Sequence, residues 1–267
     1  MKIRLLPVAL FLGLASTLAA VGAETIFDYT FEDGTTTGWT TGGAWQAVAV
    51  VNDPLRPSNK VLMLDNTNGA YANVQTVFEP QGEGTLRLTL QFFIADSGGG
   101  ASPGVYGIDQ YIGLEHRKTT ASPANDYGVT YGRFYLSSSQ PAINHYDGNG
   151  SGGGTWNTAN RYFLEYGKWY EYTQTVTMDG QIADYEWALY NVTDAVAIGS
   201  GTIGKVNLGG ESPDVGRLFL HPVSSSGGGL MYLDQVKLEV IPEATAAHLL
   251  LPAAFLLVAG NFYRRCR

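Results

Sequence analysis

This chain of 267 residues has almost no cysteine and few charged residues, most of them acidic. Its one cysteine, Cys266, is the penultimate residue, so no disulfide can form within the chain. Between Glu24 and Ile241 there are 11 basic and 23 acidic residues, a net charge of about −12. Nucleic acids and anionic membrane faces bind clusters of lysine and arginine. The dispersed acidic charge of residues 24–241 therefore argues against both as partners of that region.

The motifs of common hydrolases are also missing. There is no G-x-S-x-G nucleophile elbow and no H-E-x-x-H pair. The segment Gly148–Gly153 matches G-x-G-x-x-G, but no helical pattern follows it, so a phosphate-binding turn is not indicated. Three of the histidines lie in the middle of the chain, each far from the others: His116, His145 and His221.

Carboxylates that could pair across strands are present, and glycoside hydrolysis uses such pairs. The candidates are Glu165, Glu171, Asp184 and Glu186. The closely alternating acidic triad of a laminarinase-like sandwich hydrolase is absent, and Asp184-Tyr185-Glu186-Trp187 is a poor substitute. We therefore expect no enzyme, and keep a glycan hydrolase or lyase as an alternative.

Apolar residues make up 45% of the chain, which excludes an intrinsically disordered protein, and they alternate with polar ones. The clearest alternation is in Thr85–Ile94, Trp169–Met178 and Leu230–Val240. Further expected strands are 26–31, 45–51, 60–64, 72–78, 111–117, 129–136, 184–192, 201–206 and 217–221. No segment between Glu24 and Ile241 sustains a helical stripe beyond ten residues.

About a dozen short strands predict an all-β domain over residues 24–241, a two-sheet antiparallel β-sandwich of the jelly-roll kind. We expect its first and last strands to pair, since domain termini often lie close together. Three stretches rich in glycine and serine are expected to be surface loops: Ser97–Gly104, Gly148–Gly154 and Ser224–Gly229.

Residues 1–23 have the order of a signal peptide. Lys2 and Arg4 precede an apolar run, Leu5–Leu18, and Val21 and Ala23 are small residues at the −3 and −1 positions of a cleavage site. We expect the mature chain to begin at Glu24; an uncleaved membrane anchor is the alternative.

At the other end an apolar run of about 15 residues, 246–260, is followed by Arg264, Arg265 and Arg267. With its flanking residues this run can form a transmembrane helix, and the arginines place its end in the cytoplasm. An amphipathic or a core helix is the alternative. The body would then lie outside the inner membrane.

The order of Pro242-Glu243, apolar span and terminal arginines resembles the PEP-CTERM sorting signal over residues 242–267. Ala244 stands where that family has its second proline. The resemblance implies a Gram-negative-type bacterium, processing near Pro242 and Glu243 by an exosortase, and delivery to the cell surface or an exopolysaccharide matrix.

Asp234 is expected on the apolar face of the last strand, between Tyr232 and Val236, where a carboxylate must be hydrogen-bonded or paired with a metal. Phe31-Glu32-Asp33-Gly34 with Gly38-Trp39, and the last strand, resemble the opening and closing strands of jelly-roll carbohydrate-binding modules, and more loosely the concanavalin and laminin-G-like sandwiches. The resemblance implies a structural calcium ion held by Glu32 and Asp234. The alternative is an Asp234 held by hydrogen bonds alone, or a β-bulge.

A second stretch, Asp147-x-Asn149-x-Ser151-Gly152, copies part of a calcium loop, but position twelve is Thr158, so a glycine-rich loop is favoured. Within this loop Trp156, with Tyr146 nearby, is the candidate for stacking on sugar rings. Trp169 and Trp187, inside expected strands, are expected in the core.

Three functions remain open. The favoured one is a non-catalytic protein, anchored in the inner membrane until processed, that binds or structures extracellular polysaccharide. The others are a glycan hydrolase or lyase on the same fold, and a matrix protein without a small ligand. Two facing acids in a groove would indicate the enzyme, whereas an aromatic platform without them would indicate binding.

Overall fold

The computed structural model describes residues 23–42, 48–65, 73–82, 84–95, 109–116, 128–137, 140–148, 154–156, 161–179, 182–207, 215–222 and 230–242. Its sheets belong to a compact unit, Thr25–Val240. The expected signal peptide up to residue 22, Glu243 and the apolar run 246–260 lie outside the described residues. Among the residues that are described, no helix has the length and apolar character needed to span a bilayer.

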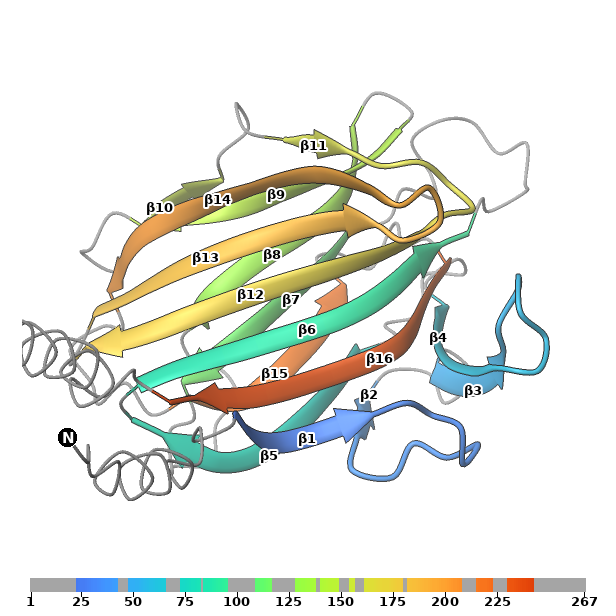
Figure 1. Ribbon diagram of the computed structural model, residues 1–267, viewed down its shortest axis with the longest axis horizontal. Coiled ribbons are helices and arrows are strands. Elements are labelled where there is room, and N and C mark those ends of the chain that lie inside the picture. Colours follow the sequence, from blue (N-terminus) through green and yellow to red (C-terminus); the bar gives the residue numbers. More distant parts are fainter. Residues whose placement is uncertain are drawn as a thin grey trace, which may run out of the picture. The chain divides into compact units, whose positions relative to one another are not determined.

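The described residues form two antiparallel sheets of eight strands each (Figure 1). Sheet 1 has the order β14-β13-β12-β6-β16-β4-β3, with β1 also paired to β16. Its strands are β1 (Glu24–Tyr29), β3 (Val48–Asn52), β4 (Lys60–Asp65), β6 (Gly84–Ile94), β12 (Trp169–Asp179), β13 (Ile182–Asn191), β14 (Val196–Asn207) and β16 (Leu230–Ile241).

Sheet 2 has the order β10-β9-β8-β7-β15-β5-β2, with β11 also paired to β9. Its strands are β2 (Thr40–Gly42), β5 (Asn73–Gln81), β7 (Asp109–His116), β8 (Gly128–Ser137), β9 (Gln140–Gly148), β10 (Gly154–Trp156), β11 (Tyr162–Phe163) and β15 (Val215–Pro222). The all-β sandwich is confirmed, and so is the pairing of its first and last strands.

Four strands were not expected from the sequence: β2, β9, β10 and β11. Strand β9 shows no period-two pattern because Pro141 to His145 are all buried, including the two polar residues Asn144 and His145. Strands β10 and β11 are too short to show any period. Gly148 pairs with Gly154 and Asp147 with Thr155, so Asp147 lies in β9, whereas residues 149–153 of the expected glycine-rich loop lie outside the described residues.

The core lies between the two sheets, and alternate residues of the long strands fill it. On β6 the side chains of Leu86, Leu88, Leu90 and Phe92 are fully buried. The Phe92 ring lies 4.6 Å from that of Phe134 on β8, which joins the sheets. Aromatic pairs of this kind contribute about 0.5–1.5 kcal/mol beyond the apolar area that they bury.

The expected alternation is wrong in the first half of β16. The structure buries Met231 and Leu233, and then Val236 and Leu238, so the buried face changes between Leu233 and Val236. Asp234 and Gln235 are consecutive and both half-buried, which is the local pattern that a β-bulge produces. Asp234 is therefore not on the inner apolar face; it lies on the same side as Tyr232.

A buried polar cluster also joins the sheets. His145 of β9 lies 2.8 Å (Nε2 to hydroxyl) from Tyr172 of β12, and Gln174 Nε2 donates to the same hydroxyl at 2.8 Å. Burial raises the pKa of the Tyr172 hydroxyl, and the tautomer of His145 decides which of these two groups donates the hydrogen bond between them. The imidazole stacks on Trp187 with ring centroids 4.2 Å apart. Trp187 and Trp169 are both buried, as expected.

This cluster makes stability depend on pH. Burial lowers the pKa of His145 to about 3, whereas the unfolded chain binds that proton near 6.5. Above pH 6.5 His145 is neutral in both states and does not reduce the free energy of unfolding. As the pH falls from 6.5 toward 3, the unfolded chain binds a proton that the folded protein excludes, so the free energy of unfolding decreases. From pH 7 to 4.5 the free energy of unfolding should drop by roughly 2–3 kcal/mol through this group alone. Urea unfolding of the protein and of His145→Gln at both pH values checks this, because the variant should lose that part of the slope; equal slopes would contradict it.

Candidate functional site

The outer face of sheet 1 carries three rows of side chains that cross the strands. Two uninterrupted registers, β6–β12 and β12–β13, and the central part of β13–β14 define them. The first row is Thr202, Glu186, Thr175 and Arg87; the second is Ser200, Ala188, Thr173 and Thr89; the third is Tyr190, Glu171 and Gln91. We call the second row, which has small side chains only, the trough.

A hollow of about 280 Å³ opens on this face over β12, β13 and β14. The residues that line it are Thr173, Thr175, Glu186, Trp187, Ala188, Ser200, Gly201 and Thr202, of which Trp187 is only 5% exposed. Its volume is near the lower end of ligand pockets. Hydroxyl groups both donate and accept hydrogen bonds, and the one charged group of the lining, Glu186, is exposed.

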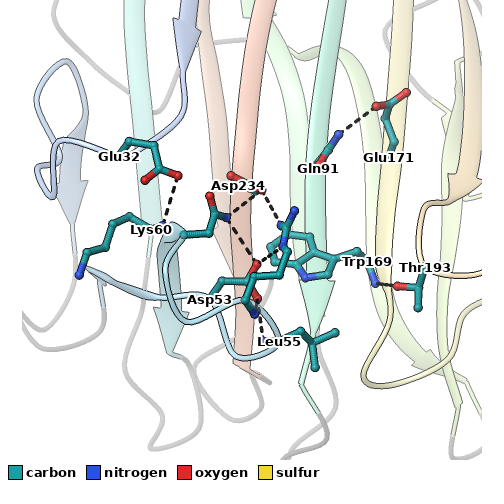
Figure 2. Close-up of polar contacts among 11 residues, drawn as sticks. Glu32, Asp53, Leu55, Lys60, Gln91, Trp169, Glu171, Thr193 and Asp234 are labelled. Atoms are coloured by element: carbon teal, nitrogen blue, oxygen red, sulfur yellow. Dashed lines mark hydrogen bonds and ion pairs between the residues drawn. The ribbon is translucent and has the colours of Figure 1, made fainter.

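Two larger residues of the third row stand beside the trough. Tyr190 is 40% exposed, a high value for an aromatic side chain within a long sheet. Opposite it, Glu171 accepts a hydrogen bond from Gln91 Nε2 at 3.2 Å, drawn in Figure 2. The hollow therefore has an aromatic ring and a fixed carboxylate next to it.

The acids on this face do not form a facing pair. Glu171 pairs with Tyr190, and Glu186 pairs with Thr175, so the two acids are offset by four positions along the strands. At about 3.3 Å per residue the offset is roughly 13 Å. Glycosidases hold their two carboxylates about 5–9.5 Å apart, so these two acids do not match that arrangement. Glu165 lies before β12, outside this face.

A loop between β3 and β4 folds over the end of the same sheet. Asp53, fully buried, accepts hydrogen bonds from the amides of Leu55 and Arg56 at 2.8 and 3.2 Å. Arg56 Nε bonds Asp53 at 2.6 Å, while Arg56 Nη2 bonds Asp234 at 2.7 Å. The guanidinium lies 5.2 Å from the ring centroid of Trp169. One arginine thus joins the loop, the last strand and β12.

These contacts set the charge state of the two carboxyls. Burial raises the pKa of Asp53, but the Leu55 amide and the Arg56 guanidinium outweigh it, so that pKa lies below its ordinary value. For Asp234 burial is the larger effect, and its pKa is raised despite hydrogen bonds from Asn59 and Arg56. Asp234 therefore depends on Arg56 as its counter-charge.

The two proposed calcium ligands, Glu32 and Asp234, accept hydrogen bonds from neighbouring residues of one segment. Asn59 Nδ2 donates to Asp234 at 3.1 Å, and the amide of Lys60 donates to Glu32 at 3.4 Å (Figure 2). Glu32 follows Phe31, whose positive φ of 60° starts the turn closed by Gly34. Within the described ranges, no three His, Cys, Asp or Glu residues gather to hold a metal. The hydrogen-bonded alternative describes the contacts seen at Asp234, and calcium stays a prediction.

The two aromatic candidates come together in sheet 2. Trp156 of β10 and Tyr146 of β9 are directly opposed in register, next to Thr155 and Asp147. Strand β10 is the edge of that sheet. Nothing more is described of these two side chains. At the ends of the sandwich, Ala23 precedes β1 and Pro242 follows β16, while Glu243 lies beyond the described residues.

The Arg56 bridge is tested by two substitutions. Arg56→Gln removes the counter-charge of fully buried Asp53 and of Asp234, and should lower the free energy of unfolding by about 2 kcal/mol, less than for a wholly buried pair because Arg56 is half exposed. Arg56→Lys keeps the charge but cannot reach both carboxylates, so an intermediate loss is expected. Chemical denaturation measures both; a neutral Arg56→Gln would show that the bridge contributes nothing.

No family model and no curated protein sequence matches this chain. Among solved structures it is similar to a carbohydrate esterase from the Shiga toxin-encoding bacteriophage phi24B (TM-score 0.56, 8% identity, covering 83% of this chain and all of that one). It is also similar to a PL-14 alginate lyase from Aplysia kurodai (TM-score 0.57, 9% identity, 82% and 100%). A third is the exoplasmic/lumenal domain of VIP36 in a Ca²⁺/Man2-bound form (TM-score 0.50, 9% identity, 84% and 91%). At such identities the similarity shows that the chain shares a β-sandwich fold with them.

Proposed function

We propose that this protein is a non-catalytic, exported protein that binds or structures extracellular polysaccharide. The hollow on the outer face of sheet 1 carries the proposal: its lining offers hydroxyl groups and one carboxylate, and an exposed tyrosine stands beside it. Sugar rings present hydroxyls at their edges and apolar C–H faces, which match such groups. The fold shared with proteins named as a carbohydrate esterase and an alginate lyase is consistent with this role.

A second contact is proposed at the β9–β10 hairpin. Trp156 and Tyr146 occupy opposed positions at the edge of sheet 2. Directly opposed residues share one face of a sheet, so two rings could extend one stacking platform there. Loss of binding in Trp156→Ala would support this contact.

Calcium is proposed as a structural ion held by Glu32 and Asp234. Each accepts a hydrogen bond from the segment Asn59–Lys60, and a solved neighbour with this fold is described in a Ca²⁺-bound form. Carboxylate oxygens are the ligands that calcium prefers. Arg56 would compete with the ion for Asp234, so the melting temperature with and without a chelator separates the two arrangements.

The enzyme alternative rests on one observation. Asp184 and Glu186 lie two positions apart on β13, about 7 Å along the strand. They stand side by side on one strand rather than facing each other across the hollow, which is why binding is preferred. Hydrolysis or elimination of a polysaccharide that disappears in Glu186→Gln would reverse this preference.

Binding is tested on a glycan array with the purified protein, with and without calcium. We expect retention of at least one polysaccharide, and a loss of at least tenfold in affinity when Thr173→Tyr fills the hollow. Thr177→Tyr, on the same strand and face but outside the lining, is the matched control. If no glycan is retained under either condition, the alternative of a matrix protein without a small ligand is favoured.

Export and sorting are also proposed. An apolar run at 246–260 cannot stay in water without exposing a large hydrophobic surface, so it must enter a bilayer or be removed. An exosortase-type enzyme would act near Pro242 and Glu243 and pass the protein from the inner membrane to the surface or matrix. Alanine at both positions should trap full-length protein in the membrane fraction on immunoblots. Unchanged release would show that the tail is no processing signal, and mature protein retaining Met1 would contradict cleavage after Ala23.

A further inference from the structure

We propose that the ligand is a neutral polysaccharide that lies across the strands of sheet 1 in the trough, with Tyr190 as its stacking platform. This inference rests on the proposed function and adds the direction, the platform and the chemical class of the ligand. Three observations carry it: the order of side-chain sizes in the rows, the exposure of Tyr190, and the charges around the trough.

The direction follows from side-chain size. On β13 the outward residues are Glu186, Ala188 and Tyr190, so Ala188 is the one low point between two large side chains. A chain that ran along β13 would meet Glu186 or Tyr190. A chain that crosses the strands meets Ser200, Ala188, Thr173 and Thr89 in succession. Four strands at about 4.8 Å spacing give a floor of roughly 14 Å, long enough for more than one sugar ring.

The platform is Tyr190. Its side chain is 40% exposed although it sits within a strand, and its register partner on β12, Glu171, is turned to Gln91. The ring borders the trough at Ala188, two positions before it on β13. An exposed aromatic ring beside a floor of methyl and hydroxyl groups can stack on the C–H face of a sugar while the floor binds its hydroxyls.

The charges argue for an uncharged ligand. In the first row Glu186 and Arg87 flank Thr175, so opposite charges occur on that side of the trough. Further along the sheet, Lys237 and Glu239 of β16 form an ion pair at 2.7 Å. The carboxylate of Glu171 and the net charge of −8 on the chain disfavour a polyanion, while Arg87 disfavours a polycation. The hydroxyl groups of a neutral sugar can donate hydrogen bonds to Glu186, accept them from Arg87, and do either with the threonines.

The experiment titrates the purified full-length chain with soluble neutral polysaccharides (a β-glucan, a xylan and a galactomannan), polygalacturonate and glycol chitosan. We expect binding to a neutral polymer with an affinity that changes less than twofold from 50 to 500 mM salt, because no charge pairs form. Ala188→Trp, which blocks the trough at an exposed site, and Tyr190→Ala should each weaken binding at least tenfold. Tyr190→Phe should stay within twofold, since it keeps the ring face.

Phe163→Ala is the matched control, because Phe163 is 49% exposed but belongs to β11 of sheet 2. Circular dichroism confirms that each variant folds, and Ser200→Tyr replaces Ala188→Trp if that variant does not. Preferential binding of polygalacturonate or glycol chitosan, weakened by salt, would overturn the ligand class. Neutral binding that survives both Ala188→Trp and Tyr190→Ala would overturn the trough and its platform while the proposed function stands. Binding to none of the polymers would overturn the proposed function as well.

Discussion

Strands β6 and β12 pair without interruption from Gly84 and Met178 to Phe93 and Trp169, and the β12–β13 register is equally regular. This register decides both faces of sheet 1 at once. Because side chains alternate with a period of two, the residues that put Leu88, Leu90 and Tyr172 into the core also place Thr89 and Thr173 outside in one row. A shift by one residue would bury the threonines and expose the leucines. In a body without disulfides, the hydrophobic core therefore fixes the shape of the candidate binding surface.

The second constraint is the break in β16. The same strand has to bury Met231 and Leu233 at one end and Val236 and Leu238 at the other, which alternation alone does not allow. The change of face leaves Asp234 half-buried on the outer side, and Arg56 supplies its counter-charge from a loop far away in sequence. Arg56 also covers Trp169, so the ring of a residue on the outer face becomes part of a small second core with Phe93 and Val61. The change of face in β16 and the loop that carries Arg56 are thus linked through Asp234.

The alternation of apolar and polar residues predicted those parts of the fold that depend on neighbouring residues in the sequence. Strands such as β6 and β12 could be predicted because apolar and polar residues alternate in them. The pairing of β1 with β16 could be predicted because the two ends of a domain often lie close together. Strand β9 could not be predicted in this way, because consecutive residues of it are buried and two of them, Asn144 and His145, are polar residues of the kind usually found on the surface. The partner of Asp234 was also beyond reach: a buried carboxylate predicts that something pairs with it, but Arg56 lies 178 positions away and no local pattern links them. The sequence places Trp156 and Tyr146 near one glycine-rich stretch, and only the register of β9 with β10 shows that they are opposed.

The trough illustrates the same limit. Thr173, Ala188 and Ser200 come from three strands and are ordinary residues in each, so nothing in the sequence distinguishes them. They become a surface only when two registers place them side by side, between a row with Glu186 and a row with Tyr190. The same registers hold Glu171 and Glu186 four positions apart, too far for a catalytic pair. The registers that form the proposed sugar site therefore also hold Glu171 and Glu186 apart, and this separation is the physical reason why we propose binding rather than hydrolysis for this face.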